Sequence, residues 1–148
     1  MKTKTFDYRK IPNHQLPKKR WIKRPMLQVT LSNGGRRQHV VCLVDSGADE
    51  CLFHCSIGQR LGIVDFKSGI YRKFDGIAES VEAYMHPIRL QIQDFPESVE
   101  IYAGFTDSDG VWALLGQSGF FSNYKVSFER WRGRMEISSR PEPIDRLA

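Results

Sequence analysis

The most informative stretch of this sequence is Val40-Val41-Cys42-Leu43-Val44, which runs directly into Asp45-Ser46-Gly47-Ala48-Asp49. A run of apolar, mostly β-branched residues predicts a strand that is buried on both faces. A carboxylate at the end of such a strand needs an explanation, because an isolated buried charge is costly. The Ser46 hydroxyl can hydrogen-bond locally, and Gly47 permits a tight turn. Taken alone, Asp45 could simply begin an Asx-turn between two strands, so these residues leave a structural and a catalytic interpretation open.

Outward from this stretch, the chain reads as a series of short strands. Asn33-Gly34 is typical of a hairpin turn between two of them, and Ser56 is expected to cap a short helix that ends at Leu61 before Gly62. The expected strands cover residues 26–31, 38–44, 51–54, 81–92, 98–105, 112–116, 126–128 and 135–137, with a polar loop or hairpin at 65–80 and a short helical turn at 119–121. Many short strands joined by glycine-rich turns predict an all-β barrel or sandwich.

The charge of the chain is unevenly distributed. The net charge is +5, but residues 1–24 hold nine Lys/Arg and one Asp, whereas residues 25–148 hold thirteen Lys/Arg and sixteen Asp/Glu. We therefore expect a basic N-terminal arm (1–24), one folded domain (25–137) and a C-terminal tail (138–148). The arm suits either an anionic partner or, more simply, a solvated segment or strap across the domain. The acidic domain argues against nucleic acid as the main partner.

Composition also bears on the compartment. The sequence contains no run of eighteen apolar residues, so no membrane span is expected, and its N-terminus lacks the apolar core of a secretory signal. The three cysteines, Cys42, Cys51 and Cys55, cannot all pair with one another. A reducing, cytoplasmic setting is the expectation.

The stretch Val44 to Asp49 resembles the active-site loop of the retropepsin-like aspartic proteases, in which a hydrophobic strand feeds Asp-Thr/Ser-Gly-Ala. The second signature of that family, two large apolar residues and a glycine, is matched by Leu114-Leu115-Gly116, whose glycine lies 71 residues after Asp45. Between them, residues 71–84 around Gly76 stand where the family has its flap hairpin. The resemblance covers about residues 24–137 and is to a single-domain, bacterial-like member.

This resemblance implies a fold, an activity and a set of site residues. The implied fold is an all-β, closed, barrel-like retropepsin fold with one or two short helices, assembled as a homodimer. The implied activity is that of an aspartic endopeptidase that acts on polypeptides without a cofactor or metal. The residues implied as catalytic are Asp45, Ser46 and Gly47, and those implied to bind substrate are Ala48, Asp49, Gly76 and Ile77.

The homodimer follows from the number of catalytic motifs. The mechanism needs two carboxylates that share one proton, and the chain holds a single Asp-Ser-Gly. Asp75-Gly76 and Asp109-Gly110 lack the intervening serine and follow no apolar strand. A second copy across a two-fold axis would supply the second Asp45.

One position departs from the family pattern. Retroviral members usually carry an arginine after the second signature, which commonly pairs with the acidic residue that matches Asp49, but this chain has Gln117. Asp49 then needs another partner, for which an arginine of the partner's arm is a candidate.

Other chemistries fit the sequence less well. Cys42, Cys51, His54 and Cys55 are metal-ligand types without a Cys-x-x-Cys pair, and buried free cysteines are the simpler interpretation. A serine hydrolase would need a Gly-x-Ser-x-Gly elbow, which is absent from the sequence. Two alternatives to the protease stay open. The first is a retropepsin fold that only dimerises or binds peptides, and the second is a nucleic-acid-binding module that relies on residues 1–24.

Overall fold

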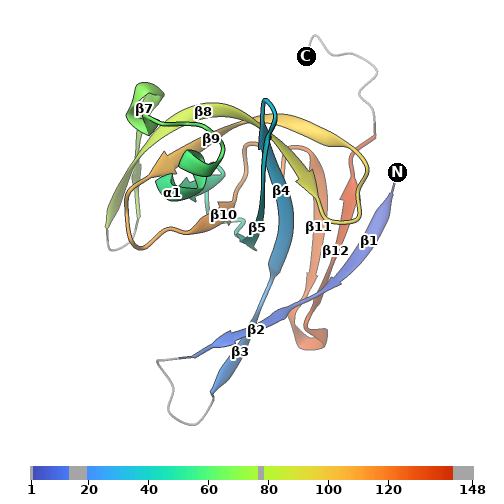
Figure 1. Ribbon diagram of the computed structural model, residues 1–148. Coiled ribbons are helices and arrows are strands. Elements are labelled where there is room, and N and C mark those ends of the chain that lie inside the picture. The colour runs from blue at the N-terminus through green and yellow to red at the C-terminus, as the bar shows by residue number, and fades with distance from the viewer. Residues whose placement is uncertain (1, 14–19, 77–78, 142–148) are drawn as a thin grey trace.

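The structure is a computed structural model that describes residues 2–13, 20–76 and 79–141 (Figure 1). The strands are β1 (Thr3–Asp7), β2 (Arg9–Pro12), β3 (Trp21–Arg24), β4 (Met26–Asn33), β5 (Arg36–Val44), β6 (Leu52–His54), β7 (Ile70–Asp75), β8 (Ser80–Ile92), β9 (Ser98–Thr106), β10 (Ala113–Leu115), β11 (Tyr124–Glu129) and β12 (Arg134–Ser139). The helical segments are α1 (Cys55–Arg60) and the 3-10 turns η1 (Phe66–Ser68) and η2 (Arg130–Arg132). The predicted all-β class with few short helices is confirmed.

Six of the described strands form one closed barrel. The seven-stranded sheet has the order β4-β5-β10-β6-β9-β8-β7, and β4 also pairs with β8, which closes the ring and leaves β7 outside it. The β5–β10 and β6–β9 pairs are parallel, and the other neighbours are antiparallel. The closed, barrel-like architecture that the sequence predicts is therefore confirmed.

The β4–β5 hairpin forms as the sequence predicts. Asn33 faces Arg36 across the turn, and Gly34 has φ +61°, a value that favours glycine. Alternate residues of β4, namely Leu27, Val29 and Leu31, are buried in the barrel. Because buried and less buried residues alternate along β4, the sequence alone predicts this strand.

Helix α1 begins two residues earlier than the sequence predicts, because the cap is His54 rather than Ser56. The Nδ1 atom of His54 accepts a hydrogen bond from the Ser56 backbone N–H at 3.2 Å and lies 2.8 Å from the Ser56 hydroxyl. His54 therefore takes the capping role that was expected of Ser56, since its extended backbone lets the ring reach the first turn. The expected stop is present, with Gly62 at φ +84°.

The described part of the N-terminal segment contains strand β1, which joins a larger sheet, and strands β2 and β3, which pair with each other. Strand β1 pairs with β12 to complete the sheet β1-β12-β11, and Phe6 and Tyr8 pack against the main core. Strands β2 and β3 form a separate two-stranded ribbon, which projects away from both larger sheets in Figure 1. Parts of the predicted arm (14–19) and tail (142–148) lie outside the described residues, and the division into arm, domain and tail stays a prediction.

The core fills the barrel with aliphatic and aromatic side chains. Phe53, Phe105 and Phe120 are fully buried there, and Phe53 and Phe105 pack ring against ring at 5.9 Å between centroids. A second, smaller cluster joins the β7–β8 hairpin to β6 and β10, and it contains Leu52, Ala83 and Val111 with the half-buried Phe74, Val81 and Leu114. Within the described residues, no helix is long and apolar enough to cross a membrane.

Candidate active site

Asp45 directly follows β5, a strand that lies between β4 and β10 in the barrel. Val40, Cys42 and Val44 are buried, so the strand is held on its inner face up to the residue before Asp45. The Asp45 backbone N–H donates to the Leu115 carbonyl at 2.9 Å and continues the parallel β5–β10 pairing by one residue. The aspartate itself is half-buried, at the point where the strand leaves the barrel.

The loop after Asp45 is turned by its own carboxylate. The Asp45 Oδ1 atom accepts a hydrogen bond from the Gly47 N–H at 2.9 Å, and its carbonyl accepts one from the Ala48 N–H at 3.2 Å. The Asx-turn that the sequence offered as an alternative is therefore present. It does not compete with a catalytic role, because Ser46 and Gly47 are exposed beside a carboxylate whose orientation this turn fixes.

The second signature binds the loop from the other side. The backbone N–H groups of Gln117 and Ser118 donate to the carbonyls of Ala48 and Asp49, at 2.8 and 2.9 Å. Glu50 and Ser118 add an isolated parallel β-bridge. Two segments about 70 residues apart in sequence thus form one hydrogen-bonded unit.

Gly116 has a steric role in this unit. A Cβ atom at this position would lie 2.7 Å from the Ala48 carbonyl oxygen and would also clash with the Glu50 carbonyl. Both neighbours are backbone atoms, which cannot rotate away as a side chain could. The apolar-apolar-glycine pattern therefore ends in glycine because the loop of Asp45 passes directly over it.

Gln117 stands at the sequence position where the family pattern led us to expect an arginine. Its Nε2 group donates to the Ser46 carbonyl at 2.7 Å, so the side chain holds the loop at its most exposed point. Asp49 is exposed, and no ion pair to it is found within the described part of the chain. A partner for Asp49 in a second subunit stays a prediction.

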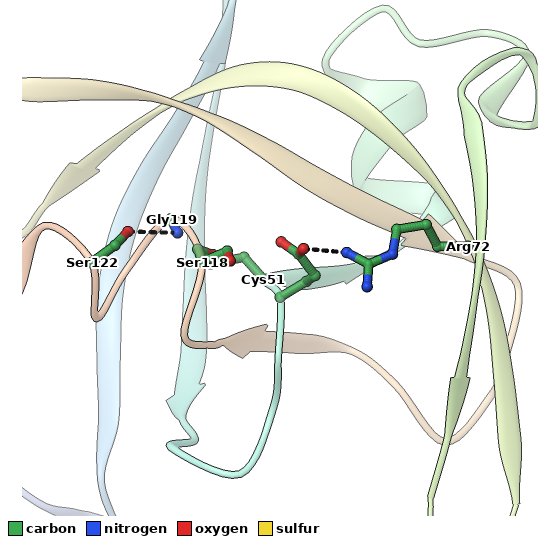
Figure 2. A network of polar contacts seen from close by, with 6 residues as sticks. Cys51, Arg72, Ser118, Gly119 and Ser122 are labelled. Carbon is green, nitrogen blue, oxygen red and sulfur yellow. Dashed lines mark hydrogen bonds and ion pairs between the residues drawn. The ribbon is translucent and has the colours of Figure 1, made fainter. Parts of the chain in front are cut away.

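Glu50 is linked to the β7–β8 hairpin instead. Its carboxylate forms an ion pair with the guanidinium of Arg72, and Figure 2 shows Arg72 extending from its strand toward this carboxylate. The Glu50 side chain is 12% exposed and that of Arg72 is 45% exposed, so the pair is half in solvent. The Arg72 guanidinium also stacks 4.9 Å from the centre of the Phe74 ring. This contact ties the hairpin to the residue that follows the Asp45 loop.

The hairpin itself lies where the flap was predicted. Strand β7 pairs with β8 from Ile70–Met85 to Asp75–Ser80, and the Gly76 N–H donates to the Glu79 carbonyl at 2.9 Å. Gly76 is exposed at this end of the hairpin. Ile77, which was predicted to bind substrate, lies outside the described residues. That the hairpin moves as a flap is a proposal taken up below.

Cys51 stabilises the same unit. Its buried thiol donates to the Ser118 carbonyl at 3.5 Å, and Figure 2 shows these two residues. The thiol also accepts the Gly116 N–H at 3.5 Å. Burial raises the pKa of Cys51 to about 11, so the thiol keeps its proton at neutral pH and can act as a donor. Burial likewise raises the pKa of Cys42. Cys55 is half-buried and also unpaired.

The sequence offers four candidate metal ligands, Cys42, Cys51, His54 and Cys55. Among the described residues, no three or more His, Cys, Asp or Glu side chains gather closely enough to hold a metal ion. His54, one of the candidate ligands, uses Nδ1 to cap helix α1.

The structure thus brings together Asp45, Ser46, Gly47, Ala48 and Asp49 on one loop, with Gly76 on a separate hairpin. Sequence reasoning missed Glu50 and Arg72 as a pair, and it saw Gln117 only as a departure from a pattern. Gln117 could have been suspected as a donor from its position alone, whereas no sequence signal pairs Glu50 with Arg72.

The fold is similar to those of two solved structures. The crystal structure of a retropepsin-like aspartic protease from Rickettsia conorii aligns with a TM-score of 0.59 and 12% identity, over 92% of this chain and 98% of that chain. The EIAV protease complexed with an inhibitor aligns with a TM-score of 0.46 and 21% identity, over 71% of this chain and 88% of that chain. No protein-family model matches the chain, and no curated protein matches its sequence. At these identities the likeness is one of fold.

Proposed function

We propose that this chain, which has the retropepsin-like fold, is an aspartic endopeptidase that hydrolyses peptide bonds as a homodimer. One observation carries the proposal. Asp45 follows a buried barrel strand, and the segment Leu115 to Ser118 holds its loop by hydrogen bonds on the far side. A carboxylate fixed in this way at an exposed turn has the defined position that a shared catalytic pair requires.

The second carboxylate has to come from another copy of the chain. The sequence holds one Asp-Ser-Gly. Of the other acidic groups in the loop, Glu50 is engaged by Arg72, and Asp49 follows the Asx-turn rather than the strand. A two-fold axis beside Asp45 would place it next to the partner's Asp45 and complete the pair.

The chemistry then follows from two like charges at close range. Both carboxylates cannot ionise together, so they share one proton. The ionised carboxylate removes a proton from a water molecule, whose oxygen attacks the peptide carbonyl carbon while the other carboxylate protonates the carbonyl oxygen. In the second step the C–N bond breaks, the amine leaves with a proton from one carboxyl group, and a hydroxyl of the tetrahedral intermediate returns its proton to the other, which restores the shared proton. These two chemical steps need no metal and no organic cofactor.

The remaining predicted residues would position the loops and the substrate. The Ser46 hydroxyl is exposed and would hydrogen-bond across the axis, and the backbone of Gly47, Ala48 and Asp49 would face the substrate. Strand β7 is the edge of the seven-stranded sheet, so its outer backbone groups can pair with an extended peptide. The β7–β8 hairpin with Gly76 and Ile77 would close over that peptide.

The cellular setting is part of the proposal. Cys42, Cys51 and Cys55 are unpaired in the structure, which suits a reducing compartment such as the cytoplasm.

The test compares purified wild-type protein with Asp45→Asn on a peptide library. Asparagine keeps an oxygen that can accept the Gly47 N–H, so the fold should survive, but the shared proton is lost. We expect at least about a thousandfold loss of cleavage, with an unchanged circular dichroism spectrum and melting temperature. Asp109→Asn is the matched control, because Asp109 also precedes a glycine but lies on an exposed loop, and it should retain activity.

Two results would redirect the proposal. Undiminished cleavage by Asp45→Asn, with Asp109→Asn equally active, would exclude the mechanism. A wild-type protein that dimerises and binds peptides without cleaving any of them would instead favour a retropepsin fold used only for dimerisation or peptide binding.

A further inference from the structure

The ribbon of β2 and β3 is the part of the molecule with the least support from the rest of the chain. Among the described strands, β2 and β3 pair only with each other. A two-stranded ribbon on its own is marginally stable in water. Its base is fixed, because the Tyr8 N–H donates to the Gly133 carbonyl at 2.7 Å and the Val44 N–H donates to the Pro25 carbonyl at 2.9 Å. The ribbon thus projects from a firm base, at which the Lys23 side chain also lies beside Gly133.

The charges of the ribbon make its isolation more costly. Arg9 faces Arg24 across the two strands, and Lys10 faces Lys23. Like charges placed directly opposite one another destabilise a strand pair. The described residues 9–13 and 20–24 contain five Lys/Arg and no Asp/Glu, so no carboxylate within the ribbon relieves this repulsion. The arrangement is better suited to an acidic surface than to water.

One face of the ribbon is fully exposed and carries an aromatic anchor. Side chains alternate between the two faces, and the register places Lys10, Pro12, Trp21 and Lys23 on the same face. All four are exposed, and Trp21 is exposed by 56%. A tryptophan beside a pair of lysines combines the features that dominate protein interfaces, an aromatic side chain and a charge pattern that selects the partner.

The position of the ribbon indicates which partner it meets. The hydrogen bond from Val44 to Pro25 puts the base of the ribbon next to the strand end that carries Asp45. Each strand is four residues long, about 13 Å at ~3.3 Å per residue. In Figure 1 the ribbon extends away from the barrel beyond that end of β5. If a second subunit brings its own Asp45 to the axis, its surface begins within the reach of the ribbon.

We propose that the β2–β3 ribbon is an intersubunit clasp, in which the face of Lys10, Pro12, Trp21 and Lys23 docks on an acidic surface of the second copy of the chain. The charge balance supports this occupant, because residues 25–148 hold sixteen Asp/Glu against thirteen Lys/Arg. The clasp rests on the homodimer of the proposed function and adds to it the surface that holds the two copies together. It also gives the basic N-terminal segment a role that does not require nucleic acid.

The test measures the dimer dissociation constant by analytical ultracentrifugation. The double variant Lys10→Glu/Lys23→Glu reverses the exposed face. Lys4→Glu/Lys125→Glu is its control, because these lysines are also exposed and the change in net charge is the same, but they lie on β1 and β11. We expect the ribbon variant to raise the dissociation constant at least about tenfold and the control to change it less than about threefold. The wild-type constant should also rise with salt concentration.

A second measurement does not depend on the variant folding. A photo-crosslinking amino acid at position 21, in a mixture of two differently tagged copies, should produce a covalent dimer that carries both tags. The same residue at position 131 is the control, since Trp131 is even more exposed, at 78%, and lies on η2. Crosslinking between copies should be strong from position 21 and weak from position 131.

The outcomes separate the clasp from the dimer itself. A wild-type dimer with the same dissociation constant in the ribbon variant, and no crosslink from position 21, overturns the clasp and leaves the dimer standing. A wild-type protein that stays monomeric at all concentrations overturns both. A ribbon variant that loses affinity for a fluorescent single- or double-stranded oligonucleotide, while its dimer constant is unchanged, also overturns the clasp and makes the ribbon a nucleic-acid contact.

Discussion

The Asp45 loop and the β7–β8 hairpin face the same proposed substrate but are held in very different ways. Three backbone hydrogen bonds and one from the Gln117 side chain join the loop to the segment 115–118, and Gly116 leaves no room beneath it. In the hairpin, β7 is an edge strand that pairs with β8, and its side-chain link to the loop unit is the half-exposed Arg72–Glu50 ion pair. Asp45 is fixed by backbone hydrogen bonds of its loop, whereas β7 contacts that loop unit through side chains.

This difference matches the two tasks that the proposed function assigns. A shared proton requires that two carboxylates keep a fixed separation, so the loop gains from rigidity. A peptide has to enter and leave, so the cover gains from attachments that open at low cost. Substitutions in the two regions should therefore separate into those that affect stability and those that affect access.

The largest effect is expected at Gly116. In Gly116→Ala the new Cβ would lie 2.7 Å from the Ala48 carbonyl oxygen and against the Glu50 carbonyl, so the loop must move. We expect a loss of about 2–3 kcal/mol in the free energy of unfolding and almost complete loss of cleavage, measured by denaturant titration and peptide hydrolysis. Gly35→Ala is the control, because a Cβ there meets nothing within 4 Å. Equal stability of the two variants would show that the loop is not tightly held.

A smaller effect, and only on activity, is expected at Gly76. A Cβ there would lie 2.8 Å from the Glu79 carbonyl oxygen, so Gly76→Val must distort the end of the hairpin, which is exposed and adds little to the core. We expect activity to fall about tenfold or more while the free energy of unfolding changes by less than about 0.5 kcal/mol. Gly110→Val, on an exposed loop, should leave both unchanged. Full activity of Gly76→Val would remove this end of the hairpin from the substrate cover.

The smallest effect concerns the ion pair between the two regions. Arg72→Gln removes the charge that meets Glu50, and because Arg72 is 45% exposed the free energy of unfolding should drop by less than about 1 kcal/mol. Amide hydrogen exchange in β7 should nevertheless become faster, since the hairpin opens more often. Lys73→Gln, at the next position of the same exposed strand, should not change it. Unchanged exchange in Arg72→Gln would mean that the β8 pairing alone holds the hairpin.

The parts of the fold that the sequence predicted are those with a local pattern. The Asn33-Gly34 turn, the alternation along β4 and the apolar run of β5 each specify their structure within a few residues. The two signatures around Asp45 and Gly116 could be recognised for the same reason, since each is a short local run. That the two segments hydrogen-bond to each other became clear only from the structure.

The parts that the sequence did not predict depend on contacts between distant segments. Thr3–Asp7 pairs with residues 134–138, more than 120 residues away, and no local sequence pattern predicts that pairing. Strand β7 was foreseen only as a loop or hairpin, because most of its side chains are exposed and no apolar alternation marks it. The Glu50–Arg72 pair and the Gln117–Ser46 hydrogen bond likewise join charged or polar groups that the sequence alone cannot match.

The central claim is that each active site contains one Asp45 from each of two copies. Wild-type protein and Asp45→Asn, unfolded together in varied ratios and refolded at a total concentration where the dimer persists, test it directly. If both carboxylates are needed, cleavage follows the square of the wild-type fraction, so an equal mixture keeps about one quarter of the activity. Activity that falls in direct proportion to the wild-type fraction, to about one half in that mixture, would mean that each copy works with its own Asp45 alone and would contradict the shared pair.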